Sequence, residues 1–287
     1  MNATNERLQE AILATLGCPT APWFPELTNL LVNSGWEALS SELGISSATY
    51  STTGVMRRDP TATGNLLSVD LPIPGESHPS LEFIADDLQT HFKPKEFRFF
   101  DIHEVAENGT NQTLHTAFEW IATIPSLYSS VTQPVKSIHI LESTAEGYDI
   151  SFSDPSIVFS IFVSVPSENS SHAALRVAEA VIHESMHLQL SLLEKQLPLA
   201  ISQTARHFSP WKKGQRSASG VLHALYVFTV IDAWLRQLPA SVNTYSTTRR
   251  SEIAGQVAEI ALVCFPELTK EGEDLRKYLL LQHYIYR

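Results

Sequence analysis

The sequence contains little cysteine and fewer basic than acidic residues. Its two cysteines, Cys18 and Cys264, are far apart in a chain of 287 residues and are too few for the disulfide framework of a small secreted domain. We expect both to be buried thiols, as in a protein of the reducing cytoplasm. The 20 lysines and arginines are outnumbered by 31 aspartates and glutamates, which gives a formal net charge of -11. This balance argues against nonspecific binding to nucleic acid or to an anionic membrane surface, because both require basic patches.

Two further features are missing from the sequence. Residues 1–7 lack the basic start and the long apolar core of an export signal. No stretch has the uninterrupted apolar length that we expect of a membrane-spanning helix. These absences predict a cytoplasmic protein and count against a secreted protease.

One short motif contains the residues best suited to chemistry: His183-Glu184-Ser185-Met186-His187. In an α-helix, residues four apart lie on the same face at a distance of roughly 6 Å, so the two imidazoles can bind one divalent metal ion. The apolar pattern from residue 173 to Pro198 predicts that the motif lies within a helix. A buried imidazole needs a partner for each nitrogen, and a metal on one with a hydrogen bond on the other meets that need.

The rest of the chain alternates between helical and strand patterns. Apolar periodicity predicts helices over about 6–43 with a break at Pro19, 115–127, 221–238, 249–264 and 271–286. Alternating or β-branched runs predict strands over 135–141, 148–152 and 157–165. Residues 44–80 are rich in serine, threonine and proline and predict an irregular connection.

These elements predict a mixed α/β (α+β) fold that is predominantly helical. The metal site is expected between two core helices, the one with the motif and the one over 221–238, and not in a double-stranded β-barrel. We expect an amino-terminal helical subdomain with its irregular connection over residues 1–80 and a metal-binding catalytic domain over 81–287. One continuous domain is the alternative.

Two histidines need at least one further protein group to hold a metal. The extended protease motif would require glycine at position 190 and histidine at position 193, but both are leucine. Glu194 lies on a similar helix face two turns beyond His187, roughly 10 Å along the axis, which is too far to complete the site.

Later helices offer other candidates for this third ligand. His223 lies in an apolar helix, where an imidazole without partners would be costly. A core histidine with ordinary hydrogen bonds is the other interpretation of that residue. Glu252 or Glu259 could instead serve, as in proteases that use a downstream carboxylate.

Several segments in a fixed order resemble a known family. They are Ile161-Phe162-Val163-Ser164-Val165-Pro166, the motif helix 179–187, Ser209-Pro210-Trp211, Arg216, the segment 220–228, and Leu268-Thr269-Lys270-Glu271-Gly272. Together they resemble the HExxH family of iron- and 2-oxoglutarate-dependent peptide β-hydroxylases, which modify ribosomally made precursor peptides. The likeness covers roughly residues 135–280, and only the ordered combination is specific. Lys212 and Ala224 depart from the family pattern, which has arginine and glycine at these places.

The resemblance implies a metal, a cosubstrate and a substrate. It implies that His183, His187 and His223 bind Fe(II), with O2 as the oxidant, and that the β-carbon of a side chain in a precursor peptide is hydroxylated. Neither nucleic acid nor a membrane is an expected partner.

The basic segment before the 221–238 helix would bind 2-oxoglutarate. The distal carboxylate of this cosubstrate needs a cationic partner, for which Arg216 is the candidate. Trp211 and Tyr226 are candidates for the walls of the pocket.

Glu184 has a different role in each hypothesis. In a hydroxylase it would position its neighbours or the substrate. In the alternative, a zinc metallopeptidase, it would be the general base for the attacking water. A third hypothesis is a noncatalytic peptide-binding protein that keeps the metal for structure.

Overall fold

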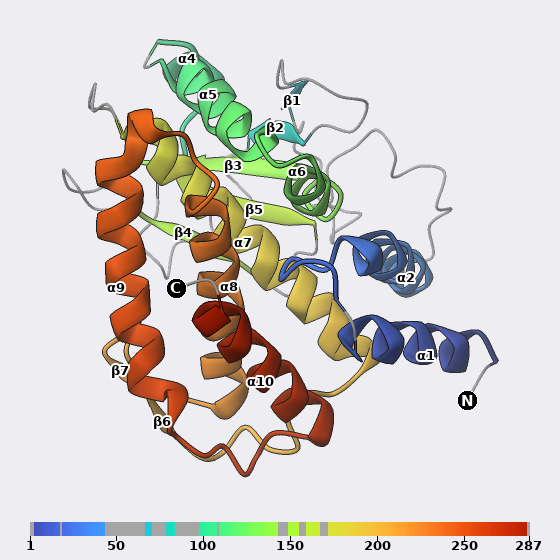
Figure 1. Cartoon of the computed structure of the whole chain (residues 1–287). Helices are drawn as coiled ribbons and strands as arrows, with labels where there is room; N and C mark the ends of the chain where they lie inside the picture. Colours follow the sequence, from blue (N-terminus) through green and yellow to red (C-terminus); the bar gives the residue numbers. More distant parts are fainter. Residues whose placement is uncertain are drawn as a thin grey trace. The chain divides into compact units, whose positions relative to one another are not determined.

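The computed structural model describes residues 3–17, 19–43, 67–70, 79–83, 98–107, 109–142, 149–154, 159–166 and 172–285. Figure 1 shows the helices and strands along the chain, which divides into two compact units. We call Val32–Leu188 the sheet unit, and Met1–Leu31 with Gln189–Arg287 the helical unit. The division falls within two helices, α2 (Pro25–Leu43) and α7 (Ala173–Gln196).

The sheet unit contains a five-stranded mixed sheet of order β1-β2-β3-β5-β4. The strands are β1 (Leu67–Asp70), β2 (Ser80–Phe83), β3 (Ser137–Leu141), β4 (Ser151–Ser153) and β5 (Ser160–Ser164). The central strands β2, β3 and β5 are parallel, and β1 and β4 are antiparallel to their neighbours. Every residue of β3 and β5 is buried, as expected for parallel strands rich in β-branched residues. Parallel strands need a crossover, and α4 (Ile102–Glu107), α5 (Thr110–Ala122) and α6 (Pro125–Thr132) lie between β2 and β3 in the chain.

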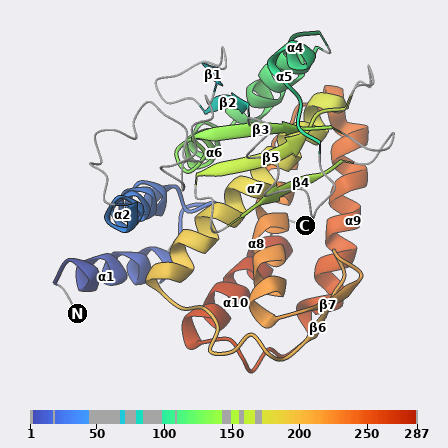
Figure 2. The same cartoon turned by 180° about the vertical axis from the view of Figure 1, so that it is seen from behind.

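One face of this sheet packs against α7. Ile138 of β3 pairs with Ile161 of β5, so both apolar side chains lie on the same face. Figures 1 and 2 show α7 along this sheet in both views. Ser151 and Ser153 of β4 share the face through their register with β5, and both hydroxyls reach α7.

The opposite face holds a buried pair of titratable groups. Glu82 of β2 and His139 of β3 have fully buried side chains, with Oε2 and Nε2 3.6 Å apart. The Nδ1 of His139 lies 3.1 Å from the Glu82 carbonyl oxygen, and its ring stacks on Phe162 with 4.7 Å between centroids. Burial raises the pKa of Glu82 to about 7, partly opposed by Ser137, and lowers the pKa of His139 to about 3. Both groups are therefore held in their neutral forms over much of the acidic range.

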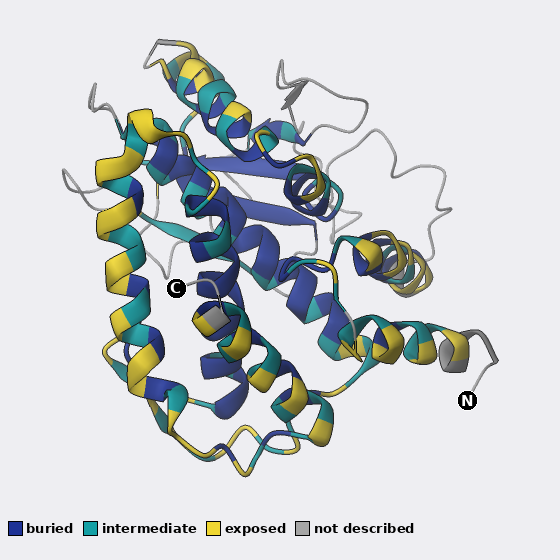
Figure 3. Cartoon of the chain, in the orientation of Figure 1, coloured by how far each residue is buried: buried dark blue, intermediate teal, exposed yellow. Residues whose placement is uncertain are grey.

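The helical unit is organised around α8 (Ala218–Leu235), in which 14 of 18 residues are buried (Figure 3). Its amino terminus is capped by Ser217, whose hydroxyl accepts from the Gly220 amide at 3.2 Å. The helix α9 (Asn243–Ala261) instead alternates between buried and exposed positions, burying a stripe that includes Ile253 and Val257. The other elements are α1 (Ala3–Gly17), the 3-10 helix η3 (Ala240–Val242), α10 (Lys270–Ile285) and the hairpin of β6 (His207–Ser209) and β7 (Gly214–Arg216).

The start of α10 is fixed by a close backbone approach. Thr269 donates its hydroxyl to the Pro198 carbonyl at 3.0 Å and its amide to the Leu199 carbonyl at 3.0 Å. The Thr269 hydroxyl also accepts from the Gly272 amide at 3.0 Å. A Cβ at Gly272 would overlap the Leu199 carbonyl oxygen, so this position requires glycine. The close backbone approach therefore explains the glycine at position 272, which amino-acid composition does not.

The expected mixed, predominantly helical fold is confirmed, and the described strands form an open sheet and a hairpin, with no closed barrel. The hairpin was missed, because its three-residue strands are too short for a periodic pattern. The expected boundary near residue 80 stays a prediction, since 44–66 and 71–78 lie outside the described residues.

Two expectations need correction. Cys264 is exposed and not buried, and Cys18 lies outside the described residues. Contrary to the expectation from apolar runs, α8 is long and apolar enough to cross a membrane by length and composition, although it is mostly buried as core helices are.

Candidate metal centre

The two motif histidines face each other on α7. His183 and His187 are half-buried, while the neighbouring Ile182 and Met186 are fully buried and fix the orientation of the helix. The Nε2 atoms of the two imidazoles lie 3.1 Å apart, and the rings meet edge to face. The structure therefore brings both predicted ligands together as their spacing of four requires.

This separation fits a shared metal ion. With metal–nitrogen bonds of about 2.1 Å, both nitrogens could bind one ion at a separation of 3.1 Å. The same separation is that of a hydrogen bond between one protonated and one unprotonated ring nitrogen. A direct metal-binding measurement distinguishes these two states.

Glu184 is held by the sheet. Its carboxylate is buried, with Oε1 accepting from the Ser151 hydroxyl at 2.7 Å and Oε2 accepting from the Ser153 hydroxyl at 2.9 Å. The His183 Nε2 lies 3.9 Å from Oε1. The carboxylate therefore links the motif helix to the edge strand β4 while remaining beside the first histidine.

His223 belongs to the helical unit and has a carboxylate partner there. Its Nε2 lies 2.9 Å from Oε2 of Glu194, and Ser219, one turn earlier on α8, donates its hydroxyl to Oε1 at 2.9 Å. Burial alone would raise the pKa of Glu194, but the hydrogen bonds from His223 and Ser219 outweigh it, and the pKa is lowered. An imidazole that donates from Nε2 to a carboxylate keeps a lone pair on Nδ1, which is the arrangement common for metal-bound histidines.

The other carboxylates considered as third ligands lie on exposed positions of α9. Glu252 pairs with Arg249 at 2.7 Å, and Glu259 is exposed. Within the described part of the chain, no three histidine, cysteine, aspartate or glutamate side chains form a group that could hold a metal. His223 as third ligand therefore stays a prediction.

Two of the predicted cosubstrate residues, Trp211 and Arg216, lie on the hairpin. Trp211, in the turn of the hairpin, stacks on Phe228 of α8 with centroids 5.4 Å apart and planes 2° from parallel. Arg216 is exposed on β7, and its side chain passes over Gly220, where an added Cβ would lie 3.5 Å from the Arg216 Cβ. The arginine is thus beside the first turn of α8, whose amino terminus also favours an anion.

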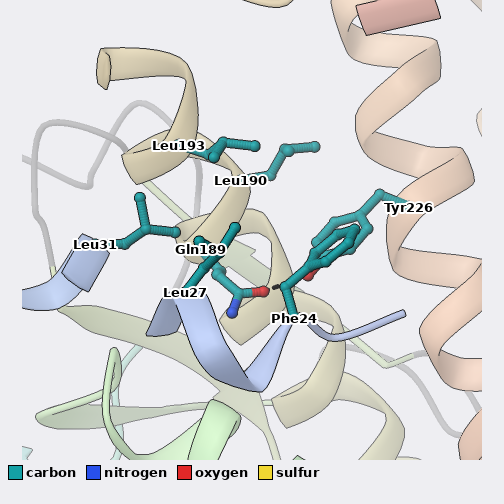
Figure 4. A pocket seen from close by; sticks show the side chains of 7 residues that line it. All are labelled: Phe24, Leu27, Leu31, Gln189, Leu190, Leu193 and Tyr226. Atoms are coloured by element: carbon teal, nitrogen blue, oxygen red, sulfur yellow. Dashed lines mark hydrogen bonds between the residues drawn. The ribbon is translucent and has the colours of Figure 1, made fainter. Parts of the chain in front are cut away.

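Tyr226 occupies a different environment, a small apolar pocket with a buried amide (Figure 4). Its hydroxyl donates to Gln189, whose amide nitrogen donates to the Trp23 carbonyl at 3.0 Å and to Thr28 at 2.9 Å. Its ring stacks on Phe24 at 5.7 Å, and burial raises its pKa well above the ordinary value. These contacts are those of a packing residue that joins α8 to α7, and its role as a cosubstrate wall stays a prediction. The residues that line the pocket are Phe24, Leu27, Leu31, Gln189, Leu190, Leu193 and Tyr226.

Sequence reasoning missed three partners of the predicted site. Ser151 and Ser153 are two apart in a strand, a spacing that places both hydroxyls on one face, but nothing in the sequence indicates which helix that face meets. Glu194 was considered only as a metal ligand, although its place on the motif helix also made it a candidate partner for a histidine of a neighbouring helix.

Comparison with known proteins gives no assignment, because no protein-family model matches the chain and no curated protein matches it significantly.

Proposed function

We propose that this protein is an Fe(II)- and 2-oxoglutarate-dependent oxygenase that hydroxylates the β-carbon of a side chain in a ribosomally made peptide. The observation that carries the proposal is the pair His183 and His187, whose Nε2 atoms face each other at 3.1 Å on one helix face. The ordered resemblance to peptide β-hydroxylases directs the choice of metal and cosubstrate. Iron at this pair would keep open positions for small ligands, as non-haem oxygenases require.

His223 is proposed as the third ligand, with Glu194 as its positioning residue. The hydrogen bond of 2.9 Å between the two holds Nε2 of the imidazole, so a metal would be bound through Nδ1. The hydroxyl of Ser219 holds the other carboxylate oxygen at 2.9 Å, so Glu194 has a single orientation. These hydrogen bonds favour His223 as the third ligand over the exposed glutamates of α9.

Arg216 is proposed to bind the distal carboxylate of 2-oxoglutarate. It is exposed, it lies beside the first turn of α8, and that helix contains His223 only three residues after Gly220. A guanidinium can form two parallel hydrogen bonds with a carboxylate, which fixes the direction of the cosubstrate. Trp211, stacked on Phe228, would provide a flat apolar wall next to it.

Bound Fe(II) and 2-oxoglutarate would supply the oxidant: one oxygen atom of O2 enters a C–H bond of the peptide and the other enters succinate, with release of carbon dioxide. The chain itself would orient the reacting groups and exclude water. Glu184 is proposed to fix the histidine pair and not to act as a base, because both of its oxygens already accept hydrogen bonds from β4. This observation favours the oxygenase over the zinc peptidase.

Anaerobic reconstitution with Fe(II), followed by addition of O2 and 2-oxoglutarate, tests the proposal. We expect binding of 2-oxoglutarate to give a visible charge-transfer absorption, and succinate to form in the presence of O2. Both signals should be absent in His183→Ala. They should persist in His115→Ala, a control histidine whose partner is Glu119 on α5, 3.6 Å away.

The fate of a peptide distinguishes the alternatives. A mass gain of one oxygen together with succinate supports the oxygenase. Chain cleavage that depends on zinc and on Glu184 would contradict it and support the metallopeptidase. Tight metal binding with no turnover of 2-oxoglutarate or peptide would instead support a structural metal.

A further inference from the structure

The hairpin β6–β7 is basic in an acidic protein. Residues 201–231 contain four lysines and arginines and no aspartate or glutamate, while the whole chain has a formal net charge of -11. Arg206, Lys212 and Lys213 are all exposed. No salt bridge to any of the three occurs within the described residues. Their charges are therefore available to a partner.

The hairpin is anchored and not loosely attached. Trp211 stacks on Phe228 of α8, and the Arg249 guanidinium of α9 lies 5.4 Å from the centre of the same Phe228 ring. At the other end of β6, His207 contacts Glu267 at 2.9 Å. The exposed lysines of the turn thus project from a fixed base, which lowers the entropy cost of binding.

Exposed apolar side chains lie at the same end of the helical unit. Phe208 of β6 is 49% exposed, Ile201 is 73% exposed and Leu262 is 97% exposed. The Ile201 amide donates to the Glu267 carbonyl at 2.7 Å, so the segment before the hairpin lies against the segment before α10. Figures 1 and 2 show the hairpin and both segments at one end of this unit in both views.

We propose that this end of the helical unit is a docking surface for an acidic peptide segment that also carries apolar side chains. We name it the hairpin patch and define it by Ile201, Arg206, Phe208, Lys212, Lys213 and Leu262. The cations select glutamate or aspartate, and the apolar residues select leucine-like neighbours. A short acidic segment fits better than a long polyanion, because the remainder of the protein is acidic and would repel a chain that extended beyond the patch.

This inference deepens the proposed function and rests on it only for the identity of the partner as the peptide substrate. The turn lysines directly follow Trp211, and Arg216 lies on the second strand of the same hairpin. A peptide held on the patch would therefore lie next to the proposed cosubstrate site. The acidic segment would be recognised apart from the hydroxylated residue.

Fluorescence anisotropy of two labelled peptides tests the patch without iron or 2-oxoglutarate. One peptide is rich in glutamate and leucine, and the matched peptide has lysine in place of each glutamate. The variant is Lys212→Glu with Lys213→Glu. Its control is Lys195→Glu with Lys277→Glu, which makes the same change in net charge at exposed sites of α7 and α10.

We expect the glutamate peptide to bind the native chain, the dissociation constant to rise at least about tenfold in the patch variant, and added salt to weaken binding. In the control variant the dissociation constant of the glutamate peptide should change by less than about twofold. The lysine peptide should not bind the native chain. A larger loss of affinity in Phe208→Ser than in Leu281→Ser would support the role of the apolar residues of the patch. Leu281 is a residue of α10 that is 53% exposed.

Three results would overturn the proposal. They are equal weakening in the patch and control variants, binding of the lysine peptide as tight as that of the glutamate peptide, and tighter binding of a single-stranded oligonucleotide or an anionic vesicle through the same lysines. Because these measurements need no turnover, failure of the iron chemistry leaves them interpretable. Peptide binding could likewise fail while succinate still forms.

Discussion

The buried pair Glu82 and His139 should give opposite pH responses when either member is replaced. Glu82 has a folded pKa of about 7 against an ordinary 4.5, so the native state binds more protons than the unfolded state between these values. Its contribution to the free energy of unfolding is therefore complete below about pH 4.5 and declines as the pH rises to about 7. The total loss is about 3 kcal/mol, at about 1.4 kcal/mol for each unit of pKa shift.

His139 acts in the opposite direction. Its folded pKa is about 3 against an ordinary 6.5, so the unfolded state binds the extra proton between these values. Its contribution is complete above about pH 6.5 and declines as the pH falls towards 3, by up to about 5 kcal/mol. Between about pH 4.5 and 6.5 the two slopes nearly cancel in the native protein.

Replacing one residue at a time should reveal how each one contributes to the pH dependence of the free energy of unfolding. In Glu82→Gln, the free energy of unfolding relative to the native protein should rise by about 2 to 3 kcal/mol from pH 5 to pH 7. In His139→Gln it should fall by about 2 kcal/mol from pH 5 to pH 6.5. Using the native protein as reference removes the contributions of titrating groups that do not contact the pair.

Urea unfolding followed by circular dichroism at several pH values measures both effects. Glu119→Gln is the matched control, because it makes the same substitution at an exposed glutamate, beside His115 on α5. A Glu82→Gln curve parallel to that of the native protein would refute the reasoning, since it would mean that Glu82 is ionised in the folded protein as it is in the unfolded one.

Two further predictions concern backbone and hydrogen-bond packing. Gly272→Ala should lower the free energy of unfolding by at least about 2 kcal/mol, because the new Cβ overlaps a carbonyl oxygen. Gly255→Ala has open space around the new Cβ on an exposed position of α9 and should raise the free energy of unfolding by about 0.5 to 1 kcal/mol. Thermal unfolding of the two variants checks this prediction, and equal shifts in melting temperature would contradict the close approach. Replacing Ser151 and Ser153 together with alanine should cost about 2 to 4 kcal/mol because the buried Glu184 carboxylate loses both donors; a urea midpoint within error of the native value would show that these hydrogen bonds do not hold β4 to α7.

The long elements of the fold could be predicted because their patterns are local. The helix with the motif and the apolar helix after it follow from periodicity, and strands β3 and β5 follow from β-branched runs. The hairpin could not be predicted, because its three-residue strands are too short for a periodic pattern and its contact of Trp211 with Phe228 joins residues 17 apart. Cys264 was wrongly expected to be buried, because apolar neighbours in sequence do not ensure burial in the connection after α9.

The candidate site likewise contains features that follow from local sequence and features that depend on packing between elements. The facing of His183 and His187 follows from helix geometry alone and is confirmed at 3.1 Å. The partners of Glu184 and His223 come from β4 and from the end of α7, and pairing across elements depends on packing that the sequence does not encode locally. Sequence reasoning therefore found the residues suited to chemistry but not those that orient them.

The central claim is that His183 and His187 bind one metal ion. Anaerobic equilibrium dialysis against Fe(II), with iron measured in the protein fraction, tests it most directly. We predict one iron per chain for the native protein and for His115→Ala, and none retained by His183→Ala or His187→Ala with the fold intact by circular dichroism. Iron retained at one per chain in both motif variants would contradict the claim.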